Sequence, residues 1–266
     1  MNRENIASSI IKYLEDRINC KNLLKFINQK IVKDSELINT QKLLITNIPV
    51  SFEIIKYNES DESNESNESD KSDGSDETLK RNMFDTFDFI TESNYTGFAY
   101  FPYLYGVLDC HYGENSKIYV FHEYFEGNIL QLINQIQHVR EWYDIVFQMI
   151  MINYFLMINH LQYASKIEDH WYKKLPTPDH KEYEINGHKL SLIHQYTIVA
   201  WSSIPSTKLE ENINIDHINV LVEYLDQKRE DIKIPPSGKI IKLLHEIIND
   251  PINTFDIVYQ YYKFNE

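Results

Sequence analysis

Glycine is scarce in this sequence of 266 residues. Only seven glycines occur, and none of them precedes Gly74. Loops that cradle phosphate, such as G-x-G-x-x-G and G-x-x-x-x-G-K-[ST], need several glycines close together, because only a backbone without side chains approaches a phosphate so tightly. No two of these glycines lie closer than seven residues apart. Neither phosphate-binding motif therefore occurs in this sequence.

Cysteine and long apolar runs are scarce as well. Cys20 and Cys110 form neither a C-x-x-C pair nor a disulfide framework, so we expect two reduced thiols in an intracellular protein. The N-terminus lacks the apolar run of a signal peptide. In the most hydrophobic stretch, residues 142–163, the longest unbroken apolar run has five residues, which predicts a buried core helix and not a membrane span.

Basic residues are outnumbered by acidic ones, 26 against 40, which gives a net charge of −14. This balance argues against nucleic acid or an anionic membrane as the main partner. Much of the surplus lies between Glu59 and Glu77, where serines recur every third residue from Ser60 to Ser75 among acids and asparagines. The segment has no apolar residue, so residues 58–78 are predicted to form a disordered loop. Its serines are candidate substrates of an acidophilic Ser/Thr kinase, and a tolerated low-complexity expansion is the alternative.

Hydrophobic spacing along the rest of the chain predicts an α+β order of elements. Residues 81–125 alternate aromatic and polar positions and end in a strand, and the Asn186-Gly187 pair is a strong signal for a hairpin turn. The predicted elements are helices within 4–30, strands over 42–46, 51–57 and 117–125, helices over 129–136 and 142–163, a hairpin over 181–193, a strand over 196–201, and helices over 216–227 and 238–249.

Three segments carry a family resemblance: residues 101–106 (FPYLYG), 122–129 (HEYFEGNI) and 141–154 (EWYDIVFQMIMINY). A strand that ends in an acidic-aromatic turn, followed by a short helix and a long buried helix, resembles the middle of the protein-kinase fold. The third segment is similar to the long helix of the kinase-like proteins of giant DNA viruses. The resemblance covers roughly residues 40–205. It implies a two-lobed kinase-like fold, with N-terminal helices and a small lobe over 1–125 and a mainly helical, truncated large lobe over 126–266.

The resemblance places residues without the required chemistry at the catalytic positions. A kinase carries D-x-x-x-x-N after its long helix, in which the Asp accepts the substrate proton and the Asn holds magnesium. Aligning Asp169 with that Asn puts Ala164 at the catalytic Asp. Ser202 stands at the D-F-G Asp, and a serine hydroxyl is a poor sole anchor for a divalent ion. No catalytic residue and no metal site are therefore expected.

Lys56, Glu123 and Tyr124 are the candidates for a vestigial nucleotide cleft. Lys56 matches the strand lysine of the family, although a surface lysine at a strand end is the simpler interpretation. Glu123 and Tyr124 lie in the segment that resembles the hinge between the kinase lobes. The glycine loop of the family would fall before Gly74, where the chain has no glycine. No cofactor is expected, with vestigial ATP binding as the alternative.

The sequence thus predicts a catalytically inactive kinase-like protein, a pseudokinase. It would bind an unidentified protein as a scaffold, regulator or virion component, in the host cytoplasm at the virus factory or in the virion. Neither nucleic acid nor membrane is expected as a partner. One alternative is an atypical Ser/Thr kinase that uses displaced acids such as Glu168, Asp169 and Asp179. The other is an unrelated viral α+β structural protein.

Overall fold

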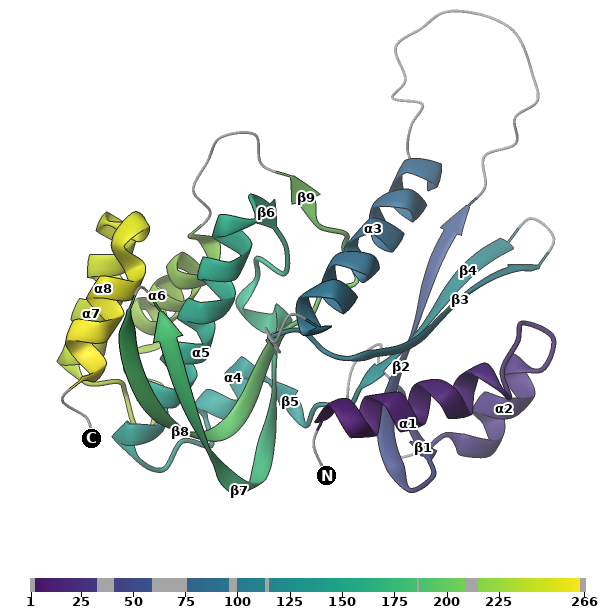
Figure 1. Cartoon of the computed structure of the whole chain (residues 1–266), viewed down its shortest axis with the longest axis horizontal. Helices are drawn as coiled ribbons and strands as arrows, with labels where there is room; N and C mark the ends of the chain where they lie inside the picture. Colours follow the sequence, from purple (N-terminus) through teal and green to yellow (C-terminus); the bar gives the residue numbers. More distant parts are fainter. Residues whose placement is uncertain are drawn as a thin grey trace, which may run out of the picture. The chain divides into compact units, whose positions relative to one another are not determined.

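The computed structural model of this chain describes residues 3–32, 41–58, 76–95, 100–112, 115–185, 187–208 and 215–263. Most of the predicted acidic loop, residues 59–75, lies outside these ranges. The chain divides into two units, Met1–Tyr124 and Phe125–Glu266. Each unit combines helices with antiparallel strands (Figure 1), so the predicted α+β class is confirmed.

The first unit is built on a four-stranded antiparallel sheet in the order β1-β2-β4-β3. Thr46 and Asn47, both with positive φ, form the tight turn between β1 and β2; asparagine tolerates this left-handed region better than most residues do. Side chains alternate between the two faces of the sheet, so Phe52 and Phe121 share one face, and Glu53 and Val120 share the other. The strands are β1 (Gln41–Ile45), β2 (Ile48–Asn58), β3 (Leu104–Tyr112) and β4 (Asn115–Glu123).

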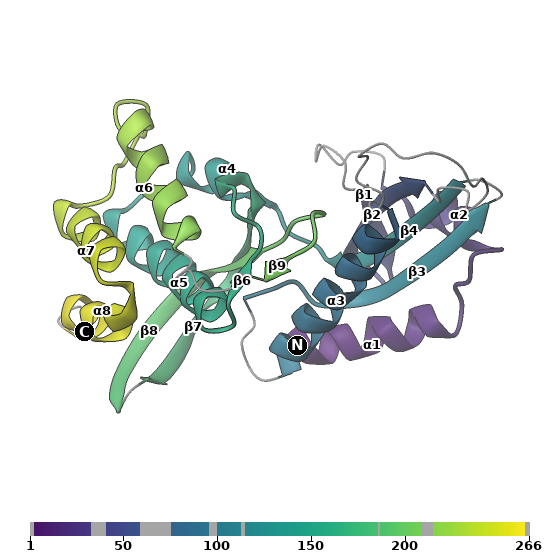
Figure 2. The same cartoon turned by 90° about the horizontal axis from the view of Figure 1, so that it is seen from above.

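Helices cover both faces of this sheet (Figures 1 and 2). The helices α1 (Arg3–Glu15) and α2 (Leu23–Lys30) bury residues such as Ile10 and Phe26 against the face that carries Phe52 and Phe121. The helix α3 (Asp76–Tyr95) lies on the opposite face, where the Lys80 ammonium pairs with Asp109 at 2.5 Å.

Helix α3 begins at the end of the acidic segment and extends into residues 81–125, where aromatic and polar positions alternate. The helical period is nevertheless present, because Met83, Phe87 and Ile90 recur at spacings of four and three residues, and all of them are buried. Burial of that stripe against the sheet decides the conformation.

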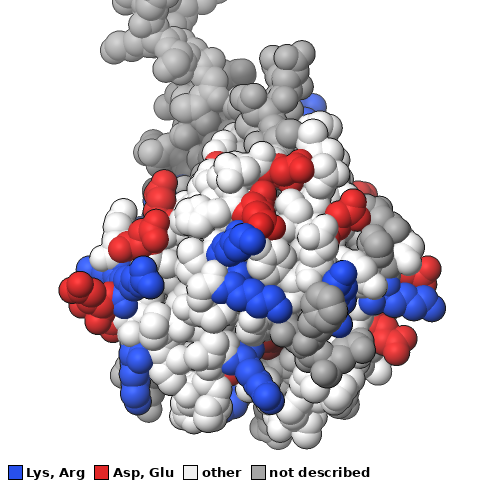
Figure 3. Space-filling view, turned by 90° about the vertical axis from the view of Figure 1, so that its left-hand side faces the viewer, with Lys and Arg blue, Asp and Glu red and all other residues white. Residues whose placement is uncertain are grey.

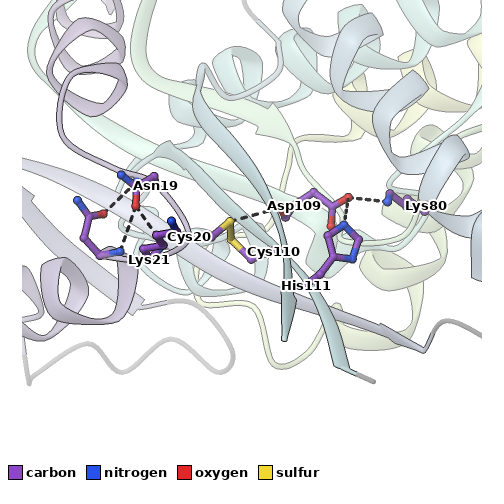
Figure 4. The surroundings of a disulfide bond; sticks show 8 residues. Asn19, Cys20, Lys21, Lys80, Asp109, Cys110 and His111 are labelled. Atoms are coloured by element: carbon purple, nitrogen blue, oxygen red, sulfur yellow. Dashed lines mark hydrogen bonds and ion pairs between the residues drawn. A yellow bond between two sulfur atoms is a disulfide. The ribbon is translucent and has the colours of Figure 1, made fainter. Parts of the chain in front are cut away.

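Cys20 and Cys110 form a disulfide, so the expectation of two free thiols was wrong. Cys20 lies in the connection between α1 and α2, and Cys110 is buried on β3, with 5.5 Å between the two Cα atoms. Figure 4 shows the disulfide together with the residues that flank Cys20 and Cys110 in the sequence. The partners are 90 residues apart in sequence, and only the packing of α1 and α2 on the sheet brings them together. No sequence spacing signals such a pair.

The second unit is organised around the long helix α5 (Val139–Ile158), most of whose residues are buried. It packs against the hairpin of β7 (His170–Ile185) and β8 (His188–Ala200) and against the C-terminal helices. The predicted hairpin at Asn186-Gly187 is confirmed, and the separately predicted strand over 196–201 is the continuation of β8. The other elements are β5 (Gly127–Asn128), α4 (Ile129–Ile133), β6 (Leu161–Gln162), η1 (Ile167–Asp169), β9 (Thr207–Lys208), α6 (Asp216–Lys228), α7 (Gly238–Asn249), η2 (Pro251–Asn253) and α8 (Thr254–Tyr262).

Two further observations concern the helices and one face of the surface. Within the described residues, no helix combines the length and the apolar character that a membrane crossing requires. Figure 3 shows one side of the molecule, on which acidic and basic side chains are interspersed.

Candidate functional site

The candidate catalytic positions of the second unit meet where β7 begins and β8 ends. The pairing of His170 with Ala200 sets the start of one strand beside the end of the other. The Trp201 backbone N–H accordingly donates to the Asp169 carbonyl oxygen at 2.9 Å. The loop before β7 therefore lies beside Ser202, although more than thirty residues separate them in sequence.

Tyr163 connects these two segments, and sequence reasoning missed it. Its hydroxyl accepts from the Ser202 backbone N–H at 2.9 Å and donates to the Ser202 carbonyl oxygen at 3.1 Å. Both residues are buried. Buried phenols of this kind need a partner for the hydroxyl, and here the main chain after β8 supplies it. No motif marks Tyr163; its only signal in the sequence is its place immediately before Ala164.

Ala164, at the position that the resemblance assigns to the catalytic Asp, has a positive φ of 50° and is buried. A residue with a Cβ pays roughly 1–2 kcal/mol to adopt the left-handed conformation. The surrounding contacts hold it there. Its methyl group can accept no proton, so this position contributes no general base.

The polar side chains next to Ala164 are engaged in local hydrogen bonds. The Asp169 carboxylate accepts from the Lys166 backbone N–H at 3.4 Å and caps η1, while the Ser202 hydroxyl accepts from the Ile204 backbone N–H at 3.1 Å. Burial raises the pKa of Asp169. These contacts give both groups a role in shaping the loop.

The other displaced acids of the atypical-kinase alternative are arranged differently. Glu168 is exposed on η1. Asp179 pairs with His194, six positions along β8 from Ala200, the partner of His170, which corresponds to roughly 20 Å of strand. It forms an exposed ion pair with Lys181 at 3.8 Å. The structure therefore brings Ala164, Asp169 and Ser202 to one end of the hairpin and keeps Asp179 on its far part.

A buried histidine pair lies under the loop. His170 Nε2 and His217 Nδ1 are 2.6 Å apart, and His217 Nε2 is 2.9 Å from the Tyr163 carbonyl oxygen. Because that carbonyl only accepts, His217 donates to it from Nε2. The carbonyl oxygens of Lys166 and Ile167, 3.2 and 3.3 Å from His170 Nδ1, are likewise acceptors. Burial lowers the pKa of His170 to about 4 and lowers the pKa of His217 well below its usual value. The pair is therefore neutral at physiological pH and links α6 to the loop.

A second buried network joins α5 to β8 through Asp144. His194 Nδ1 donates to the Asp144 carboxylate at 2.6 Å, and His194 Nε2 lies 2.6 Å from the Tyr183 hydroxyl. The order carboxylate, imidazole, hydroxyl is that of a base-activated nucleophile. The carboxylate, however, also accepts from the Gln148 amide and from the backbone N–H groups of Gln195 and Tyr196. With so many donors on one carboxylate, the network anchors the hairpin to the helix.

The nucleotide-cleft candidates of the first unit do not come together. Val50 pairs with Glu123 and Lys56 pairs with Lys117, so Glu123 and Lys56 lie six positions apart along the paired strands, a separation of roughly 20 Å. Lys56 is exposed, and it lies on the sheet face opposite α3. Tyr124 is half-buried, with the Lys42 ammonium 4.4 Å from its ring centre.

Glu123 is occupied by an ion pair that the sequence did not suggest. Arg3 of α1 donates to its carboxylate from Nε and from Nη2, the latter at 2.6 Å, and also to the Phe101 carbonyl oxygen at 3.2 Å. The Glu123 side chain is only 4% exposed. Its charge is thus neutralised inside the unit, and the carboxylate fixes the start of α1 on the sheet.

The resemblance puts Lys56 at the phosphates of a nucleotide and Glu123 at its base, and the two residues lie roughly 20 Å apart along the paired strands. In the described part of the chain, no three His, Cys, Asp or Glu side chains converge into a cluster that could hold a metal ion.

Comparison with known proteins gives one full-length relative. No family model matches the chain. A protein of Acanthamoeba polyphaga mimivirus, described as "Uncharacterized protein R691", is 38% identical over 275 residues, which cover 98% of this chain and 99% of the mimivirus protein. Similarity at this level extends through both units.

Proposed function

The chain belongs to the family of this mimivirus protein, and on that premise we propose that it is a kinase-like protein that transfers no phosphate and acts by binding another protein. The observation that carries the proposal is the loop before β7. Ala164 has no proton acceptor, and the polar side chains of Asp169 and Ser202 are engaged in local hydrogen bonds.

The order of the elements supports the kinase-like part of the proposal. In the first unit α3 follows β2 and precedes β3 and β4. The second unit then gives the short helix α4, the long buried helix α5, a loop and the hairpin β7–β8. This is the succession that the resemblance implies between the hinge and the D-F-G segment.

The chemistry of phosphoryl transfer supports the inactive part of the proposal. Positioning and charge stabilisation supply almost all catalysis in this reaction. A carboxylate displaced by several ångströms therefore does not replace the missing one. The Asp169 carboxylate accepts a hydrogen bond from the backbone of its own loop. At the position of the D-F-G Asp stands Ser202, whose main chain bonds to Tyr163 and whose hydroxyl accepts from the Ile204 backbone N–H.

A phosphoryl-transfer assay tests the proposal. Purified full-length protein is incubated with magnesium and radiolabelled ATP, alone and with casein or myelin basic protein as acceptor. We expect no labelling above that in the absence of protein. The matched control is Asp169→Ala, which should give the same blank result. Transfer by the wild-type chain that is lost in Asp169→Ala would instead establish the atypical kinase.

The disulfide favours the virion over the host cytoplasm as the place of action. Bonds such as Cys20–Cys110 persist in oxidising surroundings and at virion surfaces and are rare in the reducing cytosol. Blocking free thiols in purified virions and in infected-cell extract, followed by mass spectrometry, distinguishes the two locations. We expect the linked peptides in virions; free Cys20 and Cys110 there would contradict this location.

A further inference from the structure

A groove of about 440 Å³ lies in the first unit between α1, α3 and β3. Its lining is mainly apolar, and we call it the edge groove. Five consecutive residues of β3 form one wall, and side chains of the two helices form the others. The edge groove is lined by Leu104–Leu108, Leu14, Ile18, Phe84 and Phe87.

The edge groove runs along the open side of the sheet. β3 is the last strand in the order β1-β2-β4-β3, and its partner among the described strands is β4. The register of β3 shifts between Leu104 and Gly106, but Gly106, Val107 and Leu108 alternate between the two faces of the sheet. A cavity lined by all three must therefore border the edge of the strand. The positions of the helices support this, because α1 reaches the edge from one face of the sheet and α3 reaches it from the other.

Gly106 lies in the floor of the edge groove. A Cβ atom there would point toward α1 and make ordinary contacts with Leu14 Cδ1 at 3.8 Å and Phe121 Cδ2 at 4.0 Å. An edge strand presents backbone N–H and C=O groups on alternate residues, which are the groups that pair with an added strand.

The rim of the edge groove is acidic. Glu15 of α1 and Asp88 of α3 line it, and both are exposed. Within the described ranges neither carboxylate has an ion-pair partner. Asp85 and Glu92, also exposed, lie three residues before and four residues after Asp88 and therefore on the same side of α3. None of the described residues that line the groove is a lysine or an arginine.

We propose that the edge groove binds an extended segment of a partner protein, which adds to the sheet as a strand beside β3. The segment carries alternating apolar side chains, which enter the groove, and basic residues that meet Glu15 and Asp88. The occupant's charge excludes the chain's own acidic segment between Glu59 and Glu77. A second copy of the chain is disfavoured too, because pairing two such edges brings acidic rims together. This inference rests on the proposed protein-binding function and specifies the chemistry of the partner.

Peptide titration on the full-length protein tests the edge groove. The probe is a fluorescein-labelled peptide in which valines alternate with threonines between terminal lysines. The matched peptide has glutamates in place of the lysines. Two further peptides carry backbone N-methyl groups on alternate residues, one in each register. We expect the basic peptide to bind, and the acidic peptide and at least one N-methylated peptide to bind at least tenfold more weakly, since each removes a contact that strand addition requires.

Charge reversal on the protein locates the peptide. Glu15→Lys with Asp88→Lys should weaken binding of the basic peptide roughly tenfold or more and leave the melting temperature unchanged, because both side chains are exposed. The matched control, Asp226→Lys with Glu230→Lys, makes the same change of net charge on exposed residues of the second unit and should leave binding unchanged. Amide NMR shifts on adding the peptide should concentrate at Leu104–Leu108.

Four results would overturn the inference: no binding at about 1 mM peptide, equal loss in the control variant, binding of both N-methylated peptides as tight as that of the unmethylated peptide, or a dimer in sedimentation that the edge reversal abolishes. The phosphoryl-transfer assay distinguishes failure of the edge-groove inference from failure of the proposed function. A blank transfer assay with no peptide binding removes the edge groove alone. Phosphate transfer removes the proposed function whatever the peptide does.

Discussion

At the residue scale, buried polar side chains carry much of the specificity of the second unit. Asp144 is one of the polar residues that interrupt the apolar sequence of α5. In the structure it is the acceptor that fixes β8 on the helix through His194 and the backbone of Gln195 and Tyr196. A buried carboxylate is tolerated only with such donors.

Replacing Asp144 by alanine should therefore lower the free energy of unfolding by roughly 3–5 kcal/mol, because the substitution leaves several buried donors without an acceptor. Urea denaturation followed by circular dichroism measures the change. The matched control is Asp179→Ala on the same hairpin, where the ion pair with Lys181 is exposed and less than about 1 kcal/mol is expected. Equal losses in the two variants would contradict the anchoring role.

The His170–His217 pair predicts a pH dependence. Its folded-state pKa values lie below the usual 6.5, with that of His170 near 4. Between pH 6.5 and 4 the unfolded chain therefore binds more protons than the native one, and stability falls as the pH falls, by about 1.4 kcal/mol per pH unit for each histidine. Urea denaturation at several pH values in this window should give a shallower slope for His217→Gln than for the wild type. Parallel slopes would show that the pair is not responsible.

At the scale of elements, two contacts fix the N-terminal helices on the sheet. Arg3 joins the start of α1 to the end of β4 through Glu123, and Cys20 joins the connection after α1 to β3 through Cys110. The first contact also explains why the segment that resembles a kinase hinge carries a buried acid. Glu123 is part of the packing of α1, and its carboxylate faces a guanidinium inside the unit.

A double-mutant cycle tests the Arg3–Glu123 pair. Arg3→Met leaves a buried carboxylate without its partner and should destabilise the chain by roughly 3–5 kcal/mol. Arg3→Met with Glu123→Leu replaces both charges by apolar groups and should recover most of that loss. Thermal or urea unfolding of the four proteins gives the coupling energy. Strict additivity of the single changes would contradict a direct pair.

At the scale of the whole molecule, each unit has its own core. The first unit is cross-linked by a disulfide, and the second contains buried hydrogen-bond networks. The disulfide belongs entirely to Met1–Tyr124, and the histidine pair and the Asp144 network belong entirely to Phe125–Glu266. Breaking the disulfide or one of the networks should therefore first lower the local stability of the unit that contains it.

Reduction of the disulfide should lower the stability of the first unit by roughly 2–5 kcal/mol, because the bond closes a loop of 90 residues in the unfolded chain. Hydrogen exchange with and without dithiothreitol should show faster exchange in α1 and β3 and unchanged exchange in α5. The control, Cys20→Ser with Cys110→Ala, should show no response to dithiothreitol. Uniform acceleration through both units would contradict the localised role.

Particular residues show how far the sequence could predict this structure. Asn186-Gly187 marked a hairpin because a two-residue turn has a local chemistry. The apolar pattern of α5 marked a core helix for a similar reason. By contrast, Tyr163 meets Ser202, and His170 meets His217, across roughly forty and fifty residues. No local pattern encodes such pairs, because they form only when separate elements pack.

The candidate site divides in the same way. Ala164 and Ser202 were found from a resemblance in local order, and their lack of catalytic chemistry is a property of side chains that needs no coordinates. The separation of Lys56 from Glu123 depends on strand register, and the acidic edge groove depends on which strand ends the sheet. Neither can be read from spacing along the chain.

The sequence by itself determined the α+β class, the helix α5, the hairpin turn and the absence of a glycine-rich phosphate loop, because each follows from residue type and short-range period. Only the tertiary structure decided that Cys20 and Cys110 are bonded and that Arg3 neutralises Glu123. Those outcomes depend on which apolar faces bury one another, and burial is a property of the folded chain as a whole.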